Sequence, residues 1–186
     1  MFPSNPTGRG IRQRGFSLLE LLISIAVAAV IIGIALVYFE QVRAAQRDRD
    51  AVSGLHSLVA VIHQVYRTPN YGTLSGPVLA KASSFARSLA DSSGNLMAPW
   101  GTPIQVGPAI YAGIAGATFQ MLYTRVPTEH CTTLLKDSYG AFLKVQVGGV
   151  VLKDMSSTPV VETTDLNSIL AACSSAPDPD VTLISS

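Results

Sequence analysis

The hydrophobic pattern of this chain is dominated by one apolar run near its start. Residues 21–39, LLISIAVAAVIIGIALVYF, contain no charged side chain. A helix needs about 20 predominantly apolar residues to cross a bilayer core, so the run predicts one membrane-spanning helix. Glu20 stands directly before it. A carboxylate at the centre of a span costs about 2.5–3.5 kcal/mol, and less near its end. We therefore expect Glu20 to have a partner or a hydrated neighbour, which a simple anchor does not need.

The helical pattern continues beyond the apolar run. No proline occurs between Phe16 and Thr68, and apolar residues recur at helical spacing, namely Val52, Leu55, Val59, Ile62 and Tyr66. This predicts one long helix over residues 16–67, with a half at 16–39 that is apolar all round and an amphipathic half at 40–67 that carries a domain. Pro69 is expected to end it.

Residues 68–186 predict a head of short helices and strands. Alternating positions predict strands at 104–106, 118–126 and 143–147, the last with a hairpin partner at 150–153. Helical spacing predicts helices over 79–89, over 128–135 with Thr128 as its cap, and over 166–173 with Thr164 or Asp165 as its cap. From Ser174 we expect a polar, solvated tail with some order at 181–184.

The charges around the apolar run indicate its orientation. Arg9, Arg12 and Arg14 precede it, and no acidic residue occurs among residues 1–15. The positive-inside rule therefore predicts a cytoplasmic N-terminus and an exported head. The alternative is a conventional signal peptide cut near Ala28. The apolar segment of such a peptide is only about 7–15 residues long, whereas here the uncharged run extends to Phe39.

The overall composition narrows the function classes further. The chain carries 13 basic and 12 acidic residues, and without the three arginines of residues 1–15 the net charge is −2. This balance gives no electrostatic basis for binding nucleic acid. Charged residues make up 13% of the chain, which is low for a freely soluble domain and fits a subunit that buries surface against copies of itself.

The sequence Gly15-Phe16-Ser17-Leu18-Leu19-Glu20, followed by the long apolar run, resembles the processing site of type IV prepilins and related pseudopilins. The resemblance implies that a prepilin peptidase cuts between Gly15 and Phe16 and methylates the new N-terminus of Phe16. It also implies that Glu20 pairs during assembly with the positive amine of Phe16 on a neighbouring subunit. A pair within one helix is the alternative, because Glu20 lies one turn from Phe16.

The resemblance also implies an architecture and a set of partners. The fold class is α+β, with a long N-terminal helix packed on an antiparallel sheet. Residues 1–15 are the leader that is removed, residues 16–67 the helix, with 16–39 as anchor and filament core, and residues 68–186 the head. The expected partners are the membrane, the prepilin peptidase, the inner-membrane assembly machinery with its secretin, and further copies in a helical filament. The subunit would be a single-pass inner-membrane protein before assembly and extracellular afterwards.

A second resemblance concerns the head. The loop Ala98-Pro99-Trp100-Gly101-Thr102-Pro103, then Phe119-Gln120-Met121, then Val126-Pro127 just before Cys131, is similar to type IVb major pilins of the thin-pilus kind. Those proteins also place a disulfide late in the chain. The lack of a proline in the apolar half departs from many pilins, which have one there.

The chain has two cysteines, Cys131 and Cys173, both on the predicted exported side. That compartment permits disulfides, so the even count favours a bridge over two buried thiols.

No residue pattern predicts catalysis, a metal site or a cofactor. His56 and His63 are spaced seven residues apart, which does not fit a pair of metal ligands on one helical turn, and no partner is evident for His130 from its neighbours in the sequence. Residues 91–95, DSSGN, lack the length and closing glutamate of a calcium loop and predict a plain turn. Two alternatives to a pilin remain: a type II secretion pseudopilin and a bitopic periplasmic binding domain.

Overall fold

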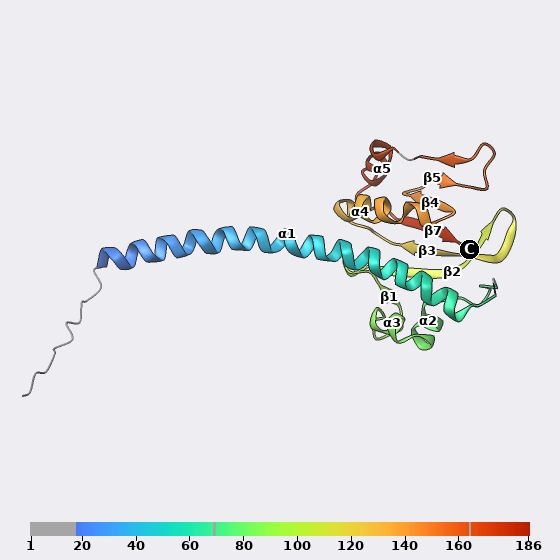
Figure 1. The fold of residues 1–186 in the computed structure, drawn as a ribbon, viewed down its shortest axis with the longest axis horizontal. Coiled ribbons are helices and arrows are strands. Elements are labelled where there is room, and N and C mark those ends of the chain that lie inside the picture. The colour runs from blue at the N-terminus through green and yellow to red at the C-terminus, as the bar shows by residue number, and fades with distance from the viewer. Residues whose placement is uncertain (1–17, 69, 164) are drawn as a thin grey trace, which may run out of the picture. The chain divides into compact units, whose positions relative to one another are not determined.

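The protein is described here by a computed structural model, which covers residues 18–68, 70–163 and 165–186. The chain divides into two compact units, one ending at Arg43 and the other comprising Ala44–Ser186. Helix α1, Leu18–Val65, is continuous over 48 residues and contributes to both units (Figure 1). It contains no proline, so its hydrogen-bond ladder is not interrupted.

The second unit is built on one antiparallel sheet of seven strands in the order β1-β2-β3-β7-β4-β5-β6. The strands are β1 Leu96–Met97, β2 Pro103–Tyr111, β3 Ile114–Tyr123, β4 Lys144–Val147, β5 Val150–Asp154, β6 Val161–Glu162 and β7 Val181–Ser185. The helices are α2 Gly76–Ala82, α3 Ser84–Ser88, α4 Thr128–Ser138 and α5 Leu166–Cys173, with a 3-10 turn at Tyr139–Ala141. In Figure 1, α4 and α5 lie close together, and α2 and α3 lie beside β1. The predicted α+β class is confirmed.

The second half of α1 supplies one wall of the head's core. Its buried residues are Ala51, Leu55, Leu58 and Ile62, which follow the spacing of a single helical face. They join a core that includes Phe119, Met121 and Tyr123 of β3 and Leu183 of β7. Fully burying one such side chain contributes about 1.5–3 kcal/mol, so this face holds the helix on the sheet.

Several local predictions are confirmed. The hairpin of β4 and β5 turns at Gly148 and Gly149, whose φ angles of 54° and 90° suit a two-residue turn. Asp165 caps α5, since its carboxylate accepts a hydrogen bond from the backbone N–H of Ser168. Thr164, the other predicted cap, lies outside the described residues.

Other local predictions are wrong. The single helix expected over 79–89 is two helices, because Ser83 between them has an extended backbone and its hydroxyl accepts from the N–H of Ala86. Thr128 does not cap α4: Pro127 occupies the cap position, and its carbonyl accepts from the N–H groups of His130 and Cys131.

Two strand predictions err at their ends. The strand expected at 104–106 runs over Pro103–Tyr111, and the one expected at 118–126 is Ile114–Tyr123. The order expected at 181–184 of the tail is confirmed as β7, and its pairing with β3 on one side and β4 on the other is new. A loop residue before it also makes a long-range bond, because the Asp180 carboxylate accepts from the N–H of Arg125. The carboxyl-terminal residues thus form a central strand of the sheet.

Candidate functional site

In the apolar half of α1, no side of the helix is buried within the described subunit. From Leu18 to Phe39 its large apolar side chains are between 53% and 76% exposed in the single subunit. Among the described residues, α1 is the helix that is long and apolar enough to cross a membrane. A helix that is hydrophobic all round must be covered by lipid or by other protein.

Glu20 lies in the first described turn of α1. The Ser24 hydroxyl donates to the backbone carbonyl of Glu20 at 2.8 Å, and not to the Glu20 carboxylate. Within residues 18–68, 70–163 and 165–186 no cation forms an ion pair with this carboxylate. Gly15 and Phe16, the other predicted assembly and processing residues, lie outside the described residues.

The apolar run ends at a change in side-chain chemistry. The Arg43 guanidinium lies 4.2 Å from the centroid of the Phe39 ring, in a cation–π contact one turn further along the helix. Tyr38 and Phe39 are both exposed at this end of the run. Aromatic residues followed by a cation are typical of the boundary between a bilayer core and water.

His130 of α4 joins the head to α1, which the sequence did not reveal. Its ring is 2% exposed, and its Nδ1 lies 2.6 Å from the Asp48 carboxylate of α1. Its Nε2 lies 3.3 Å from the exposed carboxylate of Glu129. The imidazole also stacks on Trp100, with ring centroids 5.7 Å apart and planes inclined by 12°. Asp48 precedes His130 by 82 residues, so only the fold brings the pair together.

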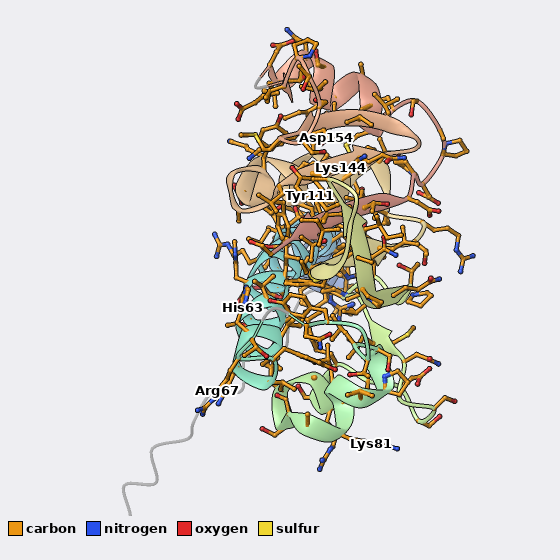
Figure 2. The ribbon with its side chains drawn as sticks, turned by 90° about the vertical axis from the view of Figure 1, so that its right-hand side faces the viewer. His63, Arg67, Lys81, Tyr111, Lys144 and Asp154 are labelled. Carbon is orange, nitrogen blue, oxygen red and sulfur yellow. A yellow bond between two sulfur atoms is a disulfide. The ribbon has the colours of Figure 1, made fainter. Side chains whose placement is uncertain are left out.

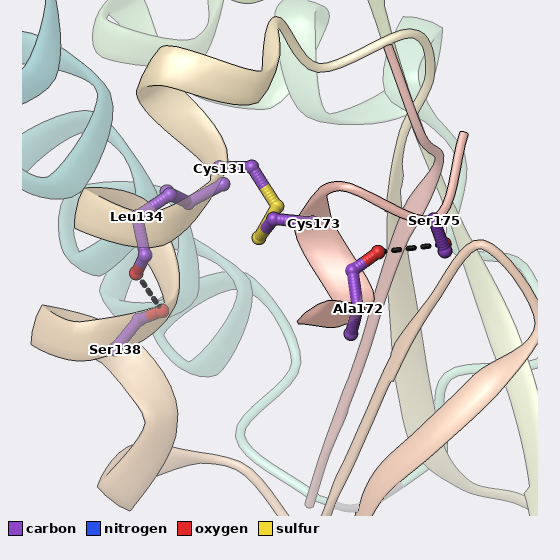
Figure 3. The surroundings of a disulfide bond; sticks show 6 residues. All are labelled: Cys131, Leu134, Ser138, Ala172, Cys173 and Ser175. Carbon is purple, nitrogen blue, oxygen red and sulfur yellow. Dashed lines mark hydrogen bonds between the residues drawn. A yellow bond between two sulfur atoms is a disulfide. The ribbon is translucent and has the colours of Figure 1, made fainter. Parts of the chain in front are cut away.

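The predicted disulfide is present between Cys131 of α4 and Cys173 of α5 (Figure 3). Both residues are fully buried. The bridge joins the first turn of α4 to the last residue of α5. Ser138, at the other end of α4, donates to the Leu134 carbonyl, and Ser175, just after α5, donates to the Ala172 carbonyl. The bridge therefore closes the segment that carries β4, β5, β6 and α5.

One ion pair is built into the sheet. Lys144 of β4 and Asp154 of β5 face each other in register, with Nζ and Oδ2 2.9 Å apart (Figure 2). Burial disfavours the charged carboxylate, but hydrogen bonds from Ser156 and Lys144 outweigh that penalty, so the pKa of Asp154 is lowered. The pKa of Tyr123 is raised by burial, which keeps its hydroxyl protonated in the core.

The turn at residues 91–95 is held by hydrogen bonds among its own residues. The Asp91 carboxylate accepts from the N–H groups of Ser93 and Asn95, each at 2.8 Å. Hydrogen bonds from Asn95 are the main cause of its lowered pKa. Over the part of the chain that the structure describes, no cluster of three or more His, Cys, Asp or Glu residues suits a metal ion.

Two family profiles match the chain. One, described as PilS N terminal, covers residues 46–186, and the other, the prokaryotic N-terminal methylation motif, covers residues 11–36. A search of curated protein sequences found no match.

Solved structures support the same assignment at the level of fold. TcpA, a type IV pilin from Vibrio cholerae El Tor biotype, is similar with a TM-score of 0.56 and 17% identity, over 76% of this chain and 99% of that one. A type IVb pilin from Salmonella typhi is similar with a TM-score of 0.51 and 14% identity, over 72% of this chain and 95% of that one. Because the PilS profile covers most of the chain and the methylation motif covers its start, the chain belongs to the PilS family and is a type IV pilin with the type IVb fold.

Proposed function

We propose that this pilin is the structural subunit of a type IV pilus, and that its mechanism is assembly rather than catalysis. The observation that carries the proposal is the exposure of every large apolar side chain of α1 between Leu18 and Phe39. A continuous apolar surface of this size marks a membrane or protein contact. The bilayer covers it before assembly, and the α1 helices of other copies cover it in the filament.

Processing comes first in this scheme. The leader, residues 1–15, is removed by a prepilin peptidase between Gly15 and Phe16, and the Phe16 amine is methylated. The match to the N-terminal methylation motif over residues 11–36 supports this step. Residues 16–39 then serve as anchor and filament core, residues 40–67 carry the head, and residues 68–186 form it.

The membrane orientation follows from charge. Three arginines precede the span, and residues 1–15 hold no acid, which favours a cytoplasmic N-terminus and an exported head. The disulfide supports this assignment, because bridges persist in oxidising compartments. Inner-membrane assembly machinery then adds the subunit to a filament that leaves the cell through a secretin.

Glu20 provides the recognition chemistry inside the filament. Cleavage leaves a positive amine on Phe16, and an apolar bundle gives that charge no solvent. The Glu20 carboxylate of a neighbouring copy neutralises it. The exposed position of Glu20 in the single subunit leaves its carboxylate accessible to a neighbouring copy.

The Glu20→Leu variant tests this function. Leucine is cheaper than glutamate in lipid, so the subunit should insert and be processed normally. Removing one partner of a buried pair costs about 3–5 kcal/mol, and the cost recurs at every subunit, so sheared filaments should fall to a small fraction of the membrane-bound subunit. Glu40→Leu, at the other end of the run, is the matched control and should assemble. Normal filament yield from Glu20→Leu would contradict the pairing.

The two alternative functions are not favoured. The PilS profile spans residues 46–186 and so includes the whole sheet. Assigning the chain to the type II secretion pseudopilins or to bitopic binding domains would not account for that match. Electron microscopy of filaments sheared from cells, with mass spectrometry of their N-terminus, checks the pilus assignment directly.

A further inference from the structure

His130 carries a buried ring whose two nitrogens both face carboxylates. Its Nδ1 lies 2.6 Å from Oδ1 of Asp48 on α1, and its Nε2 lies 3.3 Å from Oε1 of Glu129, its neighbour on α4. The ring is 2% exposed, whereas the side chains of Asp48 and Glu129 are 21% and 73% exposed. All three residues belong to the compact unit Ala44–Ser186. The contact with Asp48 therefore joins α4 to α1 inside one unit.

The two contacts determine which form of the ring fits the site. An ionised carboxylate only accepts hydrogen bonds, and a neutral imidazole has a single N–H group. The hydrogen bond of 2.6 Å to Asp48 places that N–H on Nδ1, so in the neutral ring Nε2 turns a lone pair toward Glu129. A second proton, on Nε2, converts this repulsive contact into an ion pair. The arrangement therefore suits the imidazolium better than the neutral ring.

The third neighbour of the ring is aromatic. Trp100 stacks on the imidazole with ring centroids 5.7 Å apart, and the face of an indole attracts a cation within about 6 Å. Trp100 is itself held in place, because its Nε1–H donates to the Thr102 hydroxyl at 2.7 Å. Residues 92–124, which include this loop, contain no Asp, Glu, Lys or Arg. A buried charge needs paired neighbours, and for the imidazolium these are two carboxylates and one aromatic face.

We propose that His130 is a proton-dependent clamp that fastens the head to α1 at Asp48. With both nitrogens protonated, the ring bridges Asp48 of α1 and Glu129 of α4. Loss of the Nε2 proton keeps the hydrogen bond to Asp48 but removes the charge that strengthens it, and it leaves a lone pair facing Glu129. Histidine ordinarily changes its charge between about pH 5 and pH 8, so the clamp weakens over that range. This inference concerns the single subunit and goes beyond the proposed pilus assembly.

The direction of the pH dependence follows from where the proton is held. Folding brings Asp48 to the ring across 82 residues of sequence, whereas the unfolded chain keeps only Glu129 beside it. The proposal therefore requires that the folded chain binds more protons than the unfolded chain at this site, and in that case stability falls as the pH rises. Below about pH 4 the carboxylates themselves are protonated and the clamp is lost again. The clamp is strongest in mildly acidic solution.

Thermal unfolding of the detergent-solubilised full chain, followed by the fluorescence of Trp100, tests the clamp. The Tm of the unaltered chain should fall by about 3 °C or more between about pH 5 and pH 8. His130→Gln removes the titrating ring and should flatten this profile. Glu129→Gln, at an exposed position, should flatten it in part without lowering the Tm at about pH 8. His56→Gln, exposed on α1, is the matched control and should keep the full pH dependence.

The shape of the profile separates a clamp from a histidine that only fills space. A His130→Gln variant whose Tm is lowered by the same amount at every pH would overturn the proposal, because a packing defect does not depend on the proton. An unaltered chain that becomes more stable between about pH 5 and pH 8 would overturn it as well. If His130→Gln does not fold, Glu129→Gln decides the matter, since its side chain is exposed: a full pH dependence in that variant excludes the clamp, and a reduced one supports it.

Discussion

Leu36 and Leu58 lie on the same helix, yet the structure predicts opposite consequences for replacing each by alanine. Leu58 is fully buried in the core of the head, whereas Leu36 is 62% exposed on the apolar half of α1. Leu58→Ala removes buried methyl groups and leaves a cavity. Leu36→Ala removes apolar surface that only the membrane or a neighbouring copy covers.

The magnitude follows from that burial. A Leu→Ala change at a fully buried site costs about 2–5 kcal/mol. In a domain of this size about 1 kcal/mol shifts the Tm by roughly 2–4 °C. Leu58→Ala should therefore lower the Tm of the head by about 4–20 °C, and Leu36→Ala should leave it unchanged within about 1 °C, since surface substitutions away from structural features have small effects.

The assay uses the detergent-solubilised full chain. Trp100 is the single tryptophan, and it packs against His130 and Tyr123 inside the head. Its fluorescence therefore reports unfolding of the head and not of the apolar helix. Equal Tm shifts for Leu36→Ala and Leu58→Ala, or no shift for Leu58→Ala, would refute the view that the second half of α1 is part of the head's core.

Three further predictions follow from processing, the disulfide and the ion pair. Gly15→Val should leave the precursor uncut, because the peptidase needs close backbone approach, and mass spectrometry of filaments still starting at Phe16 would disprove it. Cys131→Ser should destabilise the head by about 2–5 kcal/mol in denaturant titrations. Alkylation of both cysteines of the unaltered chain without prior reduction would contradict the bridge. The pKa of Asp154 is lowered despite burial, so its stabilising effect exists above about pH 4 and disappears as pH falls through the lowered value. Lys144→Met should make the acid-induced loss of Tm smaller.

The sequence predicted those features whose causes are local. The long helix follows from the spacing of apolar residues and the absence of proline, and the β4–β5 hairpin follows from the two glycines between alternating strands. The cap at Asp165 follows from side-chain chemistry at one position. The disulfide could be predicted because a chain with two cysteines allows only one intramolecular pairing.

The features that sequence reasoning missed depend on distant partners. Order at 181–184 was expected, but the central place of β7 was not, because its partners β3 and β4 lie far away in the chain. Asp48 and His130 meet only after α4 has packed near α1. Ile110 and Ile114 lie outside the strands predicted from the sequence, and their exposure is known only from the fold. Glu20 remained recognisable because a carboxylate beside an apolar run is unusual in itself.

The position of β7 imposes an order on biogenesis. β1, β2 and β3 form one half of the sheet and β4, β5 and β6 the other, and among the described strands β7 alone pairs with both halves. Because β7 is the last strand in chain order, the ribosome must release residues 181–185 before the halves can meet. A polypeptide that contains β6 but lacks β7 therefore exposes two unmatched strand edges, on β3 and on β4, which are targets for proteases and for aggregation. The sheet is thus complete only in subunits that contain residues 181–185.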